Sequence, residues 1–410
     1  MRILVFNCGS SSLKYRLIEL PAERELVAGE AQRVGPPTAE PSRIVYRMGG
    51  QEHTHYAEMR DHASALDEVM KLLGRDSDLV PDALGHRVVH GGALFHRHCM
   101  ITDEAIRGLD TTLDLAPIHN PPIVKLIKAC RELYPELPQV AIFDTAFHAT
   151  IPNHARTYAL PPRLREDLGI RKYGFHGISH QYVVAEAARF LGRDLDTFNA
   201  VSCHLGSGGA SLCAVVCGQS VDNTMGYSPL QGLVMSTRCG DLDPAVALRL
   251  LAREYGDSQR VNKTLNSRSG VLGMSGVSAD IRDVLRLAAE ENSPTDTADV
   301  TAQVYLWRIR KYLGAYLTVV GSADAIIFTD TIGETVPAVR QAACEGLGVF
   351  GVNVDPELNA AAKKLPADVA TKDSPVRVLA IATNEELAIA RFSHAVLTGE
   401  VEAAEKGGRS

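Results

Sequence analysis

Several patterns that identify common protein classes are missing from this chain. Its eight cysteines are scattered, and none forms a CxxC pair or a cysteine–histidine cluster at zinc spacing. No run approaches the roughly 18 apolar residues of a membrane-spanning helix, and the N-terminal apolar run ends at Phe6, too early for a signal peptide. These absences predict reduced thiols, a cytoplasmic location and no membrane partner.

Charge and phosphate-binding motifs exclude further classes. The 42 lysines and arginines are balanced by 49 acidic residues, and no basic tract resembles a nucleic-acid footprint. The chain has no Gly-Lys dipeptide and therefore no P-loop, no GxGxxG that opens a helix after a strand, and neither the HRD nor the DFG motif of protein kinases. Any anion must therefore be bound by a local site of another kind.

The order of the apolar segments favours an α/β fold. With 410 residues and 45% hydrophobic content, the chain is long enough for two or three domains with real cores. Strand-like and helix-like segments alternate, and the proline-punctuated segment 145–175 is expected to cross between two halves. The predicted strands are 2–7, 13–20, 84–89, 139–143, 199–204, 210–216, 324–329 and 376–382, and the predicted helices are 63–73, 122–133, 178–191, 243–254, 278–290, 300–319 and 385–397.

A hairpin rich in hydroxyl groups occurs twice. The segment Asn7–Tyr15, NCGSSSLKY, offers more backbone donors than a chain reversal requires, and its N–H groups and lysine suit an anion. Sliding the sequence by 197 residues places Ile3–Leu13 over Ala200–Ala210, with strand, Gly-Ser turn and second strand coinciding. The repeat predicts a duplicated domain whose hairpins clamp a phosphate chain. Chance similarity between two glycine- and serine-rich hairpins is the alternative.

Three short islands carry residues that suit phosphate chemistry. Arg87 lies in a strand-like run that ends in two glycines, although a lone arginine is usually an ordinary surface or paired residue. Asp144 ends a buried strand, where open α/β sheets bind ligands, although it would also cap the next turn. His176 lies between glycines in a loop, where a single histidine is more often incidental than catalytic.

Three further islands precede predicted helices. Arg238 stands shortly before a proline that suits a helix start. The glycine-rich stretch 269–283 opens a helix whose N-terminus favours anions, although Ser278 also suits plain capping. Thr383–Glu386 fits a capping box with Thr383 as the cap, and the helix dipole then explains the acidic Glu385 without any function. Each island alone favours the structural interpretation, but their joint occurrence does not.

Together these islands resemble the acetate kinase family, whose members form acyl phosphates on the actin-like, sugar-kinase-related fold. The resemblance runs nearly end to end. The motifs are NxGSSSLKY at 7, GHRVVHGG at 85, HNPP at 119, FDTAFH at 143, RKYGFHG at 171, TRCGDLDP at 237, SGVLGMSG at 269 and TNEELAIAR at 383. The resemblance implies duplicated actin-like ATPase (ribonuclease H-like) domains with an interdomain active-site cleft. One domain would span 1–150 and be completed by the helix 385–410, and the other would span 151–384.

The resemblance also implies an activity, which is the reversible, direct in-line transfer of the ATP γ-phosphoryl group to acetate. The cofactor would be Mg²⁺, for which Mn²⁺ can substitute, and ATP and ADP would be co-substrates. In this family Arg87 and Arg238 would flank the carboxylate and the transferring phosphoryl group. His176 would stabilise the transition state, and Asp144 would be the active-site acid.

The remaining implied residues bind metal, nucleotide and substrate. Asn7 and Glu385 would hold Mg²⁺, directly or through water. The nucleotide would be lined by Lys14, His204, Leu205, Gly206, Ser207, Gly208, Asp280, Ile281, Arg282, Thr331, Ile332, Gly333, Glu334 and Thr335, the last five in a loop. A small apolar pocket for the substrate methyl group would be formed by Val89, Ile118, Phe175 and Pro229. The family forms homodimers, so we expect a homodimer with no nucleic-acid partner.

The chemistry of carboxylate phosphorylation agrees with this set. Acetate is already ionised at neutral pH, so the nucleophile needs no general base. Phosphoryl transfer needs positioning and neutralisation of negative charge, which bidentate guanidinium groups and Mg²⁺ supply. We therefore expect Asp144 to orient an arginine or a metal-bound water rather than to abstract a proton.

Five positions depart from the family pattern. The family usually has Ala-Gly before Ile-Gly-Glu-Asn, whereas this chain has Asp330 and Thr331 there and Thr335 in place of Asn. Glycine allows close approach of a flat ring, but Thr331 adds a branched side chain and Asp330 adds a negative charge near the expected purine site. Ser207 replaces an asparagine, and Cys8 replaces an alanine. These changes predict weakened or altered donor binding, with pyrophosphate or another phosphate compound as the alternative donor.

Other functions stay open at this point. A propionate or butyrate kinase is one, because a methylene is worth only about 1 to 3 kcal/mol in a pocket. A hydroxyl-directed sugar-type kinase of the same superfamily is another, and it would need a true aspartate base and a hydroxyl-rich pocket. The third is an actin-like, nucleotide-gated binding protein, which would gain nothing from Arg87, His176 and Arg238.

Overall fold

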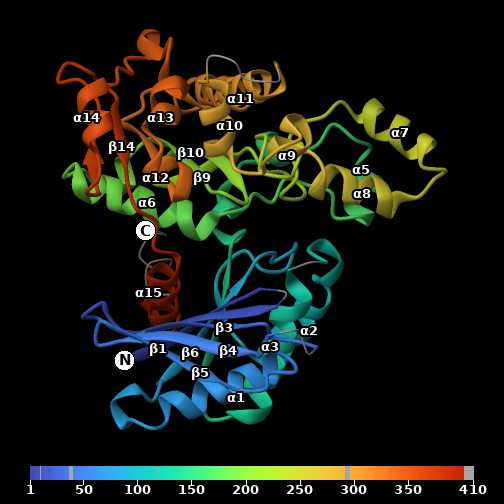
Figure 1. Cartoon of the computed structure of the whole chain (residues 1–410), viewed down its shortest axis with the longest axis vertical. Coiled ribbons are helices and arrows are strands. Elements are labelled where there is room, and N and C mark those ends of the chain that lie inside the picture. Colours follow the sequence, from blue (N-terminus) through green and yellow to red (C-terminus); the bar gives the residue numbers. More distant parts are fainter. Residues whose placement is uncertain (10, 37–39, 118, 291–295, 401–410) are drawn as a thin grey trace, which may run out of the picture. The chain divides into compact units, whose positions relative to one another are not determined.

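The computed structural model describes residues 1–9, 11–36, 40–117, 119–290 and 296–400. The chain forms two compact units, and Figure 1 shows their elements. Unit 1 comprises residues 1–146 together with the chain from Asn384 onward, and unit 2 comprises residues 147–383. The expected pocket residue Ile118, and the part of the expected helix 385–410 beyond residue 400, lie outside the described residues.

Unit 1 contains a mixed sheet with the strand order β5-β4-β3-β2-β1-β6-β8-β7. The strands are β1 (Arg2–Cys8), β2 (Ser12–Glu19), β3 (Arg24–Gln32), β4 (Arg43–Met48), β5 (Gln51–Tyr56), β6 (Ala83–Val88), β7 (Cys99–Met100) and β8 (Gln139–Phe143). The helices are α1 (His62–Leu73), α2 (Asp103–Asp110), α3 (Asn120–Leu133) and α15 (Glu385–Thr398).

Unit 2 contains a second mixed sheet with the order β11-β10-β9-β12-β14-β13. The strands are β9 (Ala200–Leu205), β10 (Ala210–Val216), β11 (Gln219–Asn223), β12 (Ala325–Thr329), β13 (Ala367–Asp368) and β14 (Arg377–Ala380). The helices are α4 (Asn153–Arg156), α5 (Pro162–Asp167), α6 (Gly177–Phe190), α7 (Pro244–Arg253), α8 (Ser258–Ser267), α9 (Gly270–Ser275), α10 (Ile281–Ala288), α11 (Asp296–Val320), α12 (Asp330–Thr335), α13 (Pro337–Cys344) and α14 (Pro356–Ala361).

The two sheets repeat one topology. Strands β3-β2-β1-β6-β8-β7 of unit 1 correspond to β11-β10-β9-β12-β14-β13 of unit 2, with the same parallel and antiparallel pairs. The hairpins agree residue by residue at an offset of 197. The equivalent contacts are the last strand pairs, Cys8–Leu13 and Leu205–Ala210, and the turn hydrogen bonds, Gly9–Ser12 and Gly206–Gly209. The predicted duplicated α/β fold is confirmed.

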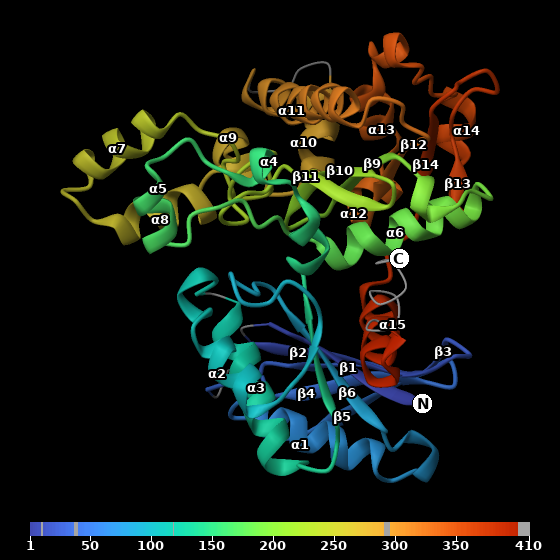
Figure 2. The same ribbon diagram turned by 180° about the vertical axis from the view of Figure 1, so that it is seen from behind.

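Helices cover both faces of the first sheet. On one face, Leu4 and Phe6 of β1 belong to a core cluster with residues of α1 and α3. On the other face α15 packs on β1, β6 and β8, and Figures 1 and 2 place α15 on the opposite side of the sheet from α1. Because both faces are covered, the central strands are apolar runs rather than alternating ones.

The second sheet is covered in the same way. Val183 and Val184 of α6 form a core cluster with Ile327 of β12 and Leu379 of β14. The long helix α11 packs on β9 and β10, and Figure 2 shows it on the side of the sheet away from α6. The helix that follows β8 along the chain is thus part of unit 2, and the helix that follows β14 is part of unit 1.

Two local predictions were wrong. The segment from Thr331 to Thr335 is not a loop but belongs to α12, because the chain turns into a helix directly after β12. The cap of α15 is Asn384 and not Thr383, because the Asn384 side chain accepts a hydrogen bond from Leu387 N at 3.1 Å.

The other predicted helix and strand boundaries agree to within a few residues, and the helix expected from 278 begins at Ile281. Strands β3, β4, β5, β7, β11 and β13 were not predicted, because they are short or lie towards the sheet edges with many exposed residues. Of the helices in the described part of the chain, none combines the length and apolarity needed to cross a membrane.

A test of the α15 packing is available at Gly85 on β6. A Cβ atom there would lie 2.7 Å from Ser393 Oγ and 3.1 Å from Ile389 Cγ2 of α15. We expect Gly85→Val to lower the free energy of unfolding by about 1 to 3 kcal/mol, because the added atoms displace a packed helix. Gly314→Ala in α11 is the control, since open space surrounds that position. Equal urea midpoints for the Gly85 variant and the parent would contradict this packing.

Candidate active site

In unit 1, three predicted residues meet at one guanidinium group. Arg87 Nε and Nη2 donate to the Asp144 carboxylate at 3.2 and 2.9 Å, and Arg87 Nη1 lies 2.9 Å from Glu385 Oε2. The side chains of Arg87, Asp144 and Glu385 are 17%, 2% and 14% exposed. One cation therefore serves two carboxylates in a largely buried position.

The sheet explains why these residues meet. Strands β6 and β8 are parallel neighbours, with Arg87 opposite Ile142 and Val88 opposite Phe143. Asp144 continues beyond the strand end, and its N–H donates to the Val88 carbonyl at 3.0 Å. The carboxyl edge of parallel strands is where α/β sheets bind ligands. Glu385 comes from the first turn of α15, where the helix dipole favours a carboxylate.

The charges of this group hold Arg87 in its cationic form. Burial alone would lower the pKa of Arg87, but the carboxylates of Asp144 and Glu385 outweigh that effect and raise the pKa. The bidentate bond to Asp144 also fixes the plane of the guanidinium. Asp144 is 2% exposed and is already occupied as an acceptor, so this arrangement suits an orienting role and not proton abstraction.

Asn7 lies near this group along the sheet. Its neighbour Phe6 is paired with His86, the residue before Arg87, and Asn7 itself is opposite Lys14 of β2. An amide oxygen of Asn7 and the carboxylates of Asp144 and Glu385 make an all-oxygen donor set. Such a set suits Mg²⁺, which binds one or two carboxylates and retains waters. No group of three or more His, Cys, Asp and Glu side chains that could hold a metal occurs within the described residues.

In unit 2, His176 is held by a chain of serine and histidine side chains. His176 caps α6 in the left-handed conformation, with φ of 58°. Its Nδ1 lies 2.9 Å from Ser211 Oγ, which lies 2.8 Å from His180 Nε2, and His180 Nδ1 lies 2.8 Å from Ser202 Oγ. Burial lowers the pKa of His180 well below its usual value, so His180 is neutral and carries one N–H.

His204 packs against the other side of His176. The two rings are stacked with centroids 4.2 Å apart. His204 Nδ1 lies 2.8 Å from Ser179 Oγ, and His204 Nε2 lies 3.0 Å from Asp330 Oδ2. Both ring nitrogens of His204 are thus engaged within unit 2.

Arg238 and His176 converge on the glycine hairpin between β9 and β10. A Cβ atom added to Gly209 would lie 3.4 Å from His176 Nε2 and 3.5 Å from Arg238 Nη1. Arg238 Nη1 also donates to the Pro229 carbonyl at 3.2 Å. Burial lowers the pKa of Arg238, but an arginine stays protonated at physiological pH. Gly209 therefore leaves space for two cationic or donor groups to approach the same backbone.

The other predicted residues are distributed as follows. Val89 follows β6 in unit 1, and Phe175 is buried in unit 2, where its carbonyl accepts from His148 and Asn223. Asp280 caps α10 and binds Arg282. The helix α12, with Thr331, Ile332, Gly333, Glu334 and Thr335, is anchored by the buried Arg340, which donates to the Gly333 and Glu334 carbonyls at 2.8 and 2.9 Å.

Sequence reasoning missed the residues that hold the histidines, namely Ser179, His180, Ser202 and Ser211. A partial signal was present, because His176 and His180 are four residues apart at the start of a helix and so share one face. The serines gave no signal, since they lie on different elements and are brought together only by the sheet of unit 2.

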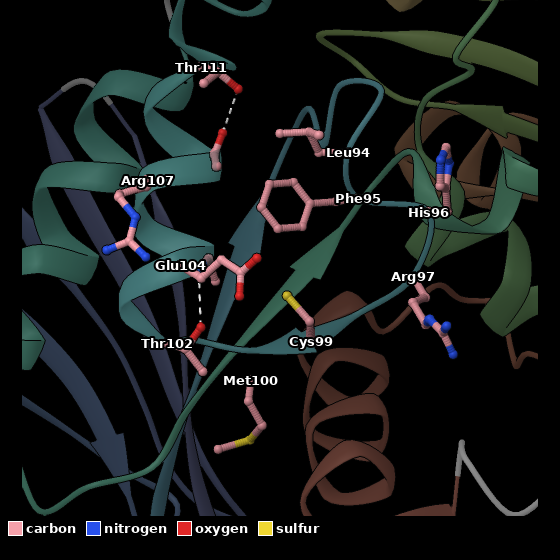
Figure 3. Close-up of a pocket in the computed structure, with 12 residues that line it drawn as sticks. Leu94, Phe95, His96, Arg97, Cys99, Met100, Thr102, Glu104, Arg107 and Thr111 are labelled. Carbon is pink, nitrogen blue, oxygen red and sulfur yellow. Dashed lines mark hydrogen bonds between the residues drawn. The ribbon is translucent and has the colours of Figure 1, made fainter.

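A separate cavity of about 720 Å³ lies in unit 1 between the segment 94–100 and α2. Figure 3 shows Leu94, Phe95 and Cys99 beside Glu104 of α2. None of the predicted site residues lines it. One packing contact leads from it toward the Arg87 group, since Phe95 stacks on Phe143, the residue before Asp144, with ring centroids 4.7 Å apart.

Comparison with known proteins gives consistent matches over almost the whole chain. Residues 2–391 match the model described as the acetokinase family. The chain is 44% identical over 397 residues to acetate kinase from Clostridium novyi (strain NT), covering 95% of this chain and 97% of that protein. It is 35% identical to the structure of acetate kinase from Porphyromonas gingivalis, with a TM-score of 0.88 and 97% and 99% of the two chains covered. A propionate kinase structure from Francisella tularensis is also 35% identical, with a TM-score of 0.87 and coverage of 95% and 98%.

The buried histidines predict acid sensitivity. Burial lowers the pKa of His86 and His148 to about 4, below the value of about 6.5 in an unfolded chain. Between these values the unfolded state binds more protons, so stability is full above pH 6.5 and falls as the pH approaches 4. We expect a loss on the order of 2 kcal/mol per histidine at pH 5.

Urea unfolding at pH 7.5, 6 and 5 measures this effect. His148→Gln should show a shallower fall than the parent, because it removes one of the groups that titrate. His154→Gln, at an exposed position, is the control and should follow the parent. Equal slopes for the His148 variant and the parent would show that this histidine does not titrate on unfolding.

Proposed function

The chain belongs to the acetokinase family, and from this premise we propose that it catalyses the reversible transfer of the ATP γ-phosphoryl group to acetate, giving acetyl phosphate and ADP. The observation that carries the proposal is the Arg87 guanidinium, held by two carboxylates at the carboxyl edge of the first sheet. A fixed, permanently charged group there suits an anionic acceptor. It cannot accept the proton that a hydroxyl acceptor would have to lose.

Within unit 1, Arg87 binds the carboxylate of acetate. Its charge reduces the repulsion between this anion and the phosphoryl group, and its fixed plane orients the attacking oxygen. Asp144 positions Arg87 and does not act as a base. Val89, which follows β6, is the apolar residue that unit 1 would offer to the methyl group.

Within unit 2, Arg238 and His176 act on the transferring phosphoryl group. Both approach Gly209, and transfer through a loose transition state depends on donors directed at the phosphoryl oxygens. Ser211 holds the Nδ1 side of His176, and the Nε2 side is the one that lies toward Gly209. The transfer from donor to acetate is then direct and in line, because the ionised acetate is itself the nucleophile and no covalent intermediate is needed.

The metal is Mg²⁺, which Asn7 and Glu385 would hold, directly or through water. When bound, Mg²⁺ neutralises charge on the phosphate oxygens. Lys14, the hairpin His204–Gly208, Asp280–Arg282 and α12 bind the nucleotide. The enzyme works in the cytoplasm as a homodimer, as the family resemblance implies.

One alternative acceptor is supported by a specific comparison. The Francisella relative is a propionate kinase at the same level of identity as the Porphyromonas acetate kinase. A kinase of propionate would use the same charged groups with a slightly larger apolar pocket. A sugar-type kinase is disfavoured because Asp144 is bound to Arg87 and is not available as a base.

The direct test is to trap acyl phosphate with hydroxylamine. The protein is given Mg²⁺, one carboxylate and either ATP or pyrophosphate. We expect hydroxamate with ATP, and a higher kcat/KM for acetate than for propionate or butyrate. Product with pyrophosphate alone would identify a different donor, and no product with either donor would refute the proposed activity.

The role of Asp144 is tested by Asp144→Asn. The amide keeps one acceptor for Arg87 but removes the charge, so we expect kcat to fall about 10- to 100-fold with activity still measurable. Complete loss of activity in a folded variant would instead support proton abstraction. Arg238→Ala is the matched comparison. We expect a larger loss of kcat, about 1000-fold, because this variant lacks the positive charge that acts on the phosphoryl group itself.

A further inference from the structure

Asp330 occupies a conformation that few residues adopt. It is the first residue of α12, directly after β12, and its φ is 62°, in the left-handed region that Asp tolerates better than most residues. Its N–H donates to Glu334 Oε1 at 2.8 Å. The same Glu334 oxygen accepts from Thr383 N at 2.9 Å. The backbone at Asp330 is therefore fixed by the fold of unit 2.

The carboxylate of Asp330 is held as firmly as its backbone. Oδ1 accepts from Thr331 N at 2.6 Å and from Thr331 Oγ1 at 3.0 Å, and Oδ2 accepts from His204 Nε2 at 3.0 Å. Burial would raise the pKa of Asp330, but the hydrogen bond and charge of His204, with the donors of Thr331, lower it well below its usual range. Asp330 therefore carries its negative charge at neutral pH.

This carboxylate lies against the glycine hairpin that joins β9 and β10. A Cβ atom added to Gly206 would be only 2.3 Å from Asp330 Oδ2, so the two residues are in direct contact. The tip residues Ser207 and Gly208 are exposed. Within the described part of the chain, no hydrogen bond from their backbone N–H groups is found. Unused N–H groups at a glycine-rich turn are suited to a phosphate.

The pairing with Asp330 also changes what His204 can do. Its Nε2–H is directed at Asp330, and its Nδ1 faces Ser179 Oγ at 2.8 Å. A phosphate can reach a nitrogen of His204 only by displacing one of these partners. The hairpin thus loses a donor for phosphate and gains a fixed negative charge.

We propose that Asp330 is a specificity-determining residue of the donor site. Its carboxylate engages His204, so that this side chain is not available to the phosphates. It also repels phosphoryl donors, and the loss of affinity increases with the negative charge that the donor places at the 204–209 hairpin. Uncharged parts of the donor are unaffected, because the effect is electrostatic. The inference rests on the proposed function in one respect, which is that this hairpin binds the phosphates of the donor.

Calorimetric binding without acetate tests the inference. The variants are Asp330→Asn, which keeps the shape and one acceptor for Thr331, and Asp330→Ala. The ligands are ADP and pyrophosphate, each with excess Mg²⁺, and adenosine as the uncharged comparison. Asp368→Asn is the matched control, because Asp368 is 23% exposed and ion-paired with Arg377, while Asp330 is 28% exposed.

We expect Asp330→Asn and Asp330→Ala to bind ADP and pyrophosphate at least 10-fold more tightly than the parent. Adenosine should bind within about twofold of the parent, and Asp368→Asn should resemble the parent for all three ligands. The gain should shrink as salt is raised, because exposed charges are screened. Thermal unfolding of each variant verifies that it is folded.

Three results would overturn the inference. They are equal ADP affinity in the parent and both Asp330 variants, no binding of ADP or pyrophosphate by either variant, and an equal change for adenosine and ADP, which would place the effect on the purine. The proposed function fails separately, since it depends on acyl phosphate formation. Tighter ADP binding in a protein that forms no acyl phosphate would leave the inference standing.

Discussion

The bond of Arg87 to Asp144 and Glu385 is the interaction on which the charged group at the carboxyl edge of the first sheet depends. A guanidinium that is 17% exposed needs counter-charges, because desolvation opposes its charge. Both carboxylates are supplied by distant parts of the chain, one after β8 and one at the start of α15. Strands β6 and β8 and helix α15 must therefore be in place before Arg87 is oriented. The ion pair with Glu385 is one of the contacts that tie α15 to unit 1, although α15 follows unit 2 in sequence.

The groups of unit 2 are oriented differently. His176 and His180 are held by serine hydroxyls, and burial keeps His180 neutral. A network of neutral groups fixes the His176 ring without adding a charge to it. The exception is Asp330, which brings a full negative charge to His204. Unlike the serine–histidine contacts, this pairing brings a charged partner to a ring of the network.

Duplication placed the same hairpin in both units, and divergence gave the copies different chemistry. Asn7 and His204 occupy equivalent positions at the end of β1 and β9, at the offset of 197 residues. Asn7 has an amide side chain, whereas His204 is stacked on His176 and bound to Asp330. The turn hydrogen bonds of the two copies agree within 0.1 Å, at 2.9 and 3.0 Å. The backbone of the hairpin was kept while its side chains were changed.

The sequence by itself determined the α/β class, the repeat and most buried strands and helices. Both signals are local patterns in the sequence. The apolar runs arise because the central strands are buried on both faces of the sheet, and the hairpin repeat is found by aligning the chain with itself. Arg87, Asp144 and Glu385 each favoured a structural interpretation when taken alone, and only their joint occurrence and the resemblance to the acetate kinase family marked them as functional candidates. The sequence did not indicate strands β3–β5 in the outer part of the first sheet, whose exposed positions weaken the pattern.

Only the tertiary structure decided which side chains meet. Asn384 caps α15 instead of the predicted Thr383. The Thr383 hydroxyl is directed to Ser179 Oγ at 3.0 Å, and the Thr383 N–H is directed to Glu334. The pairing of Asp330 with His204 joins residues 126 positions apart, on β9 and α12. Such contacts depend on strand order and on the conformation at a strand end. Neither can be recognised from a local sequence pattern, because both are fixed only when the chain has folded.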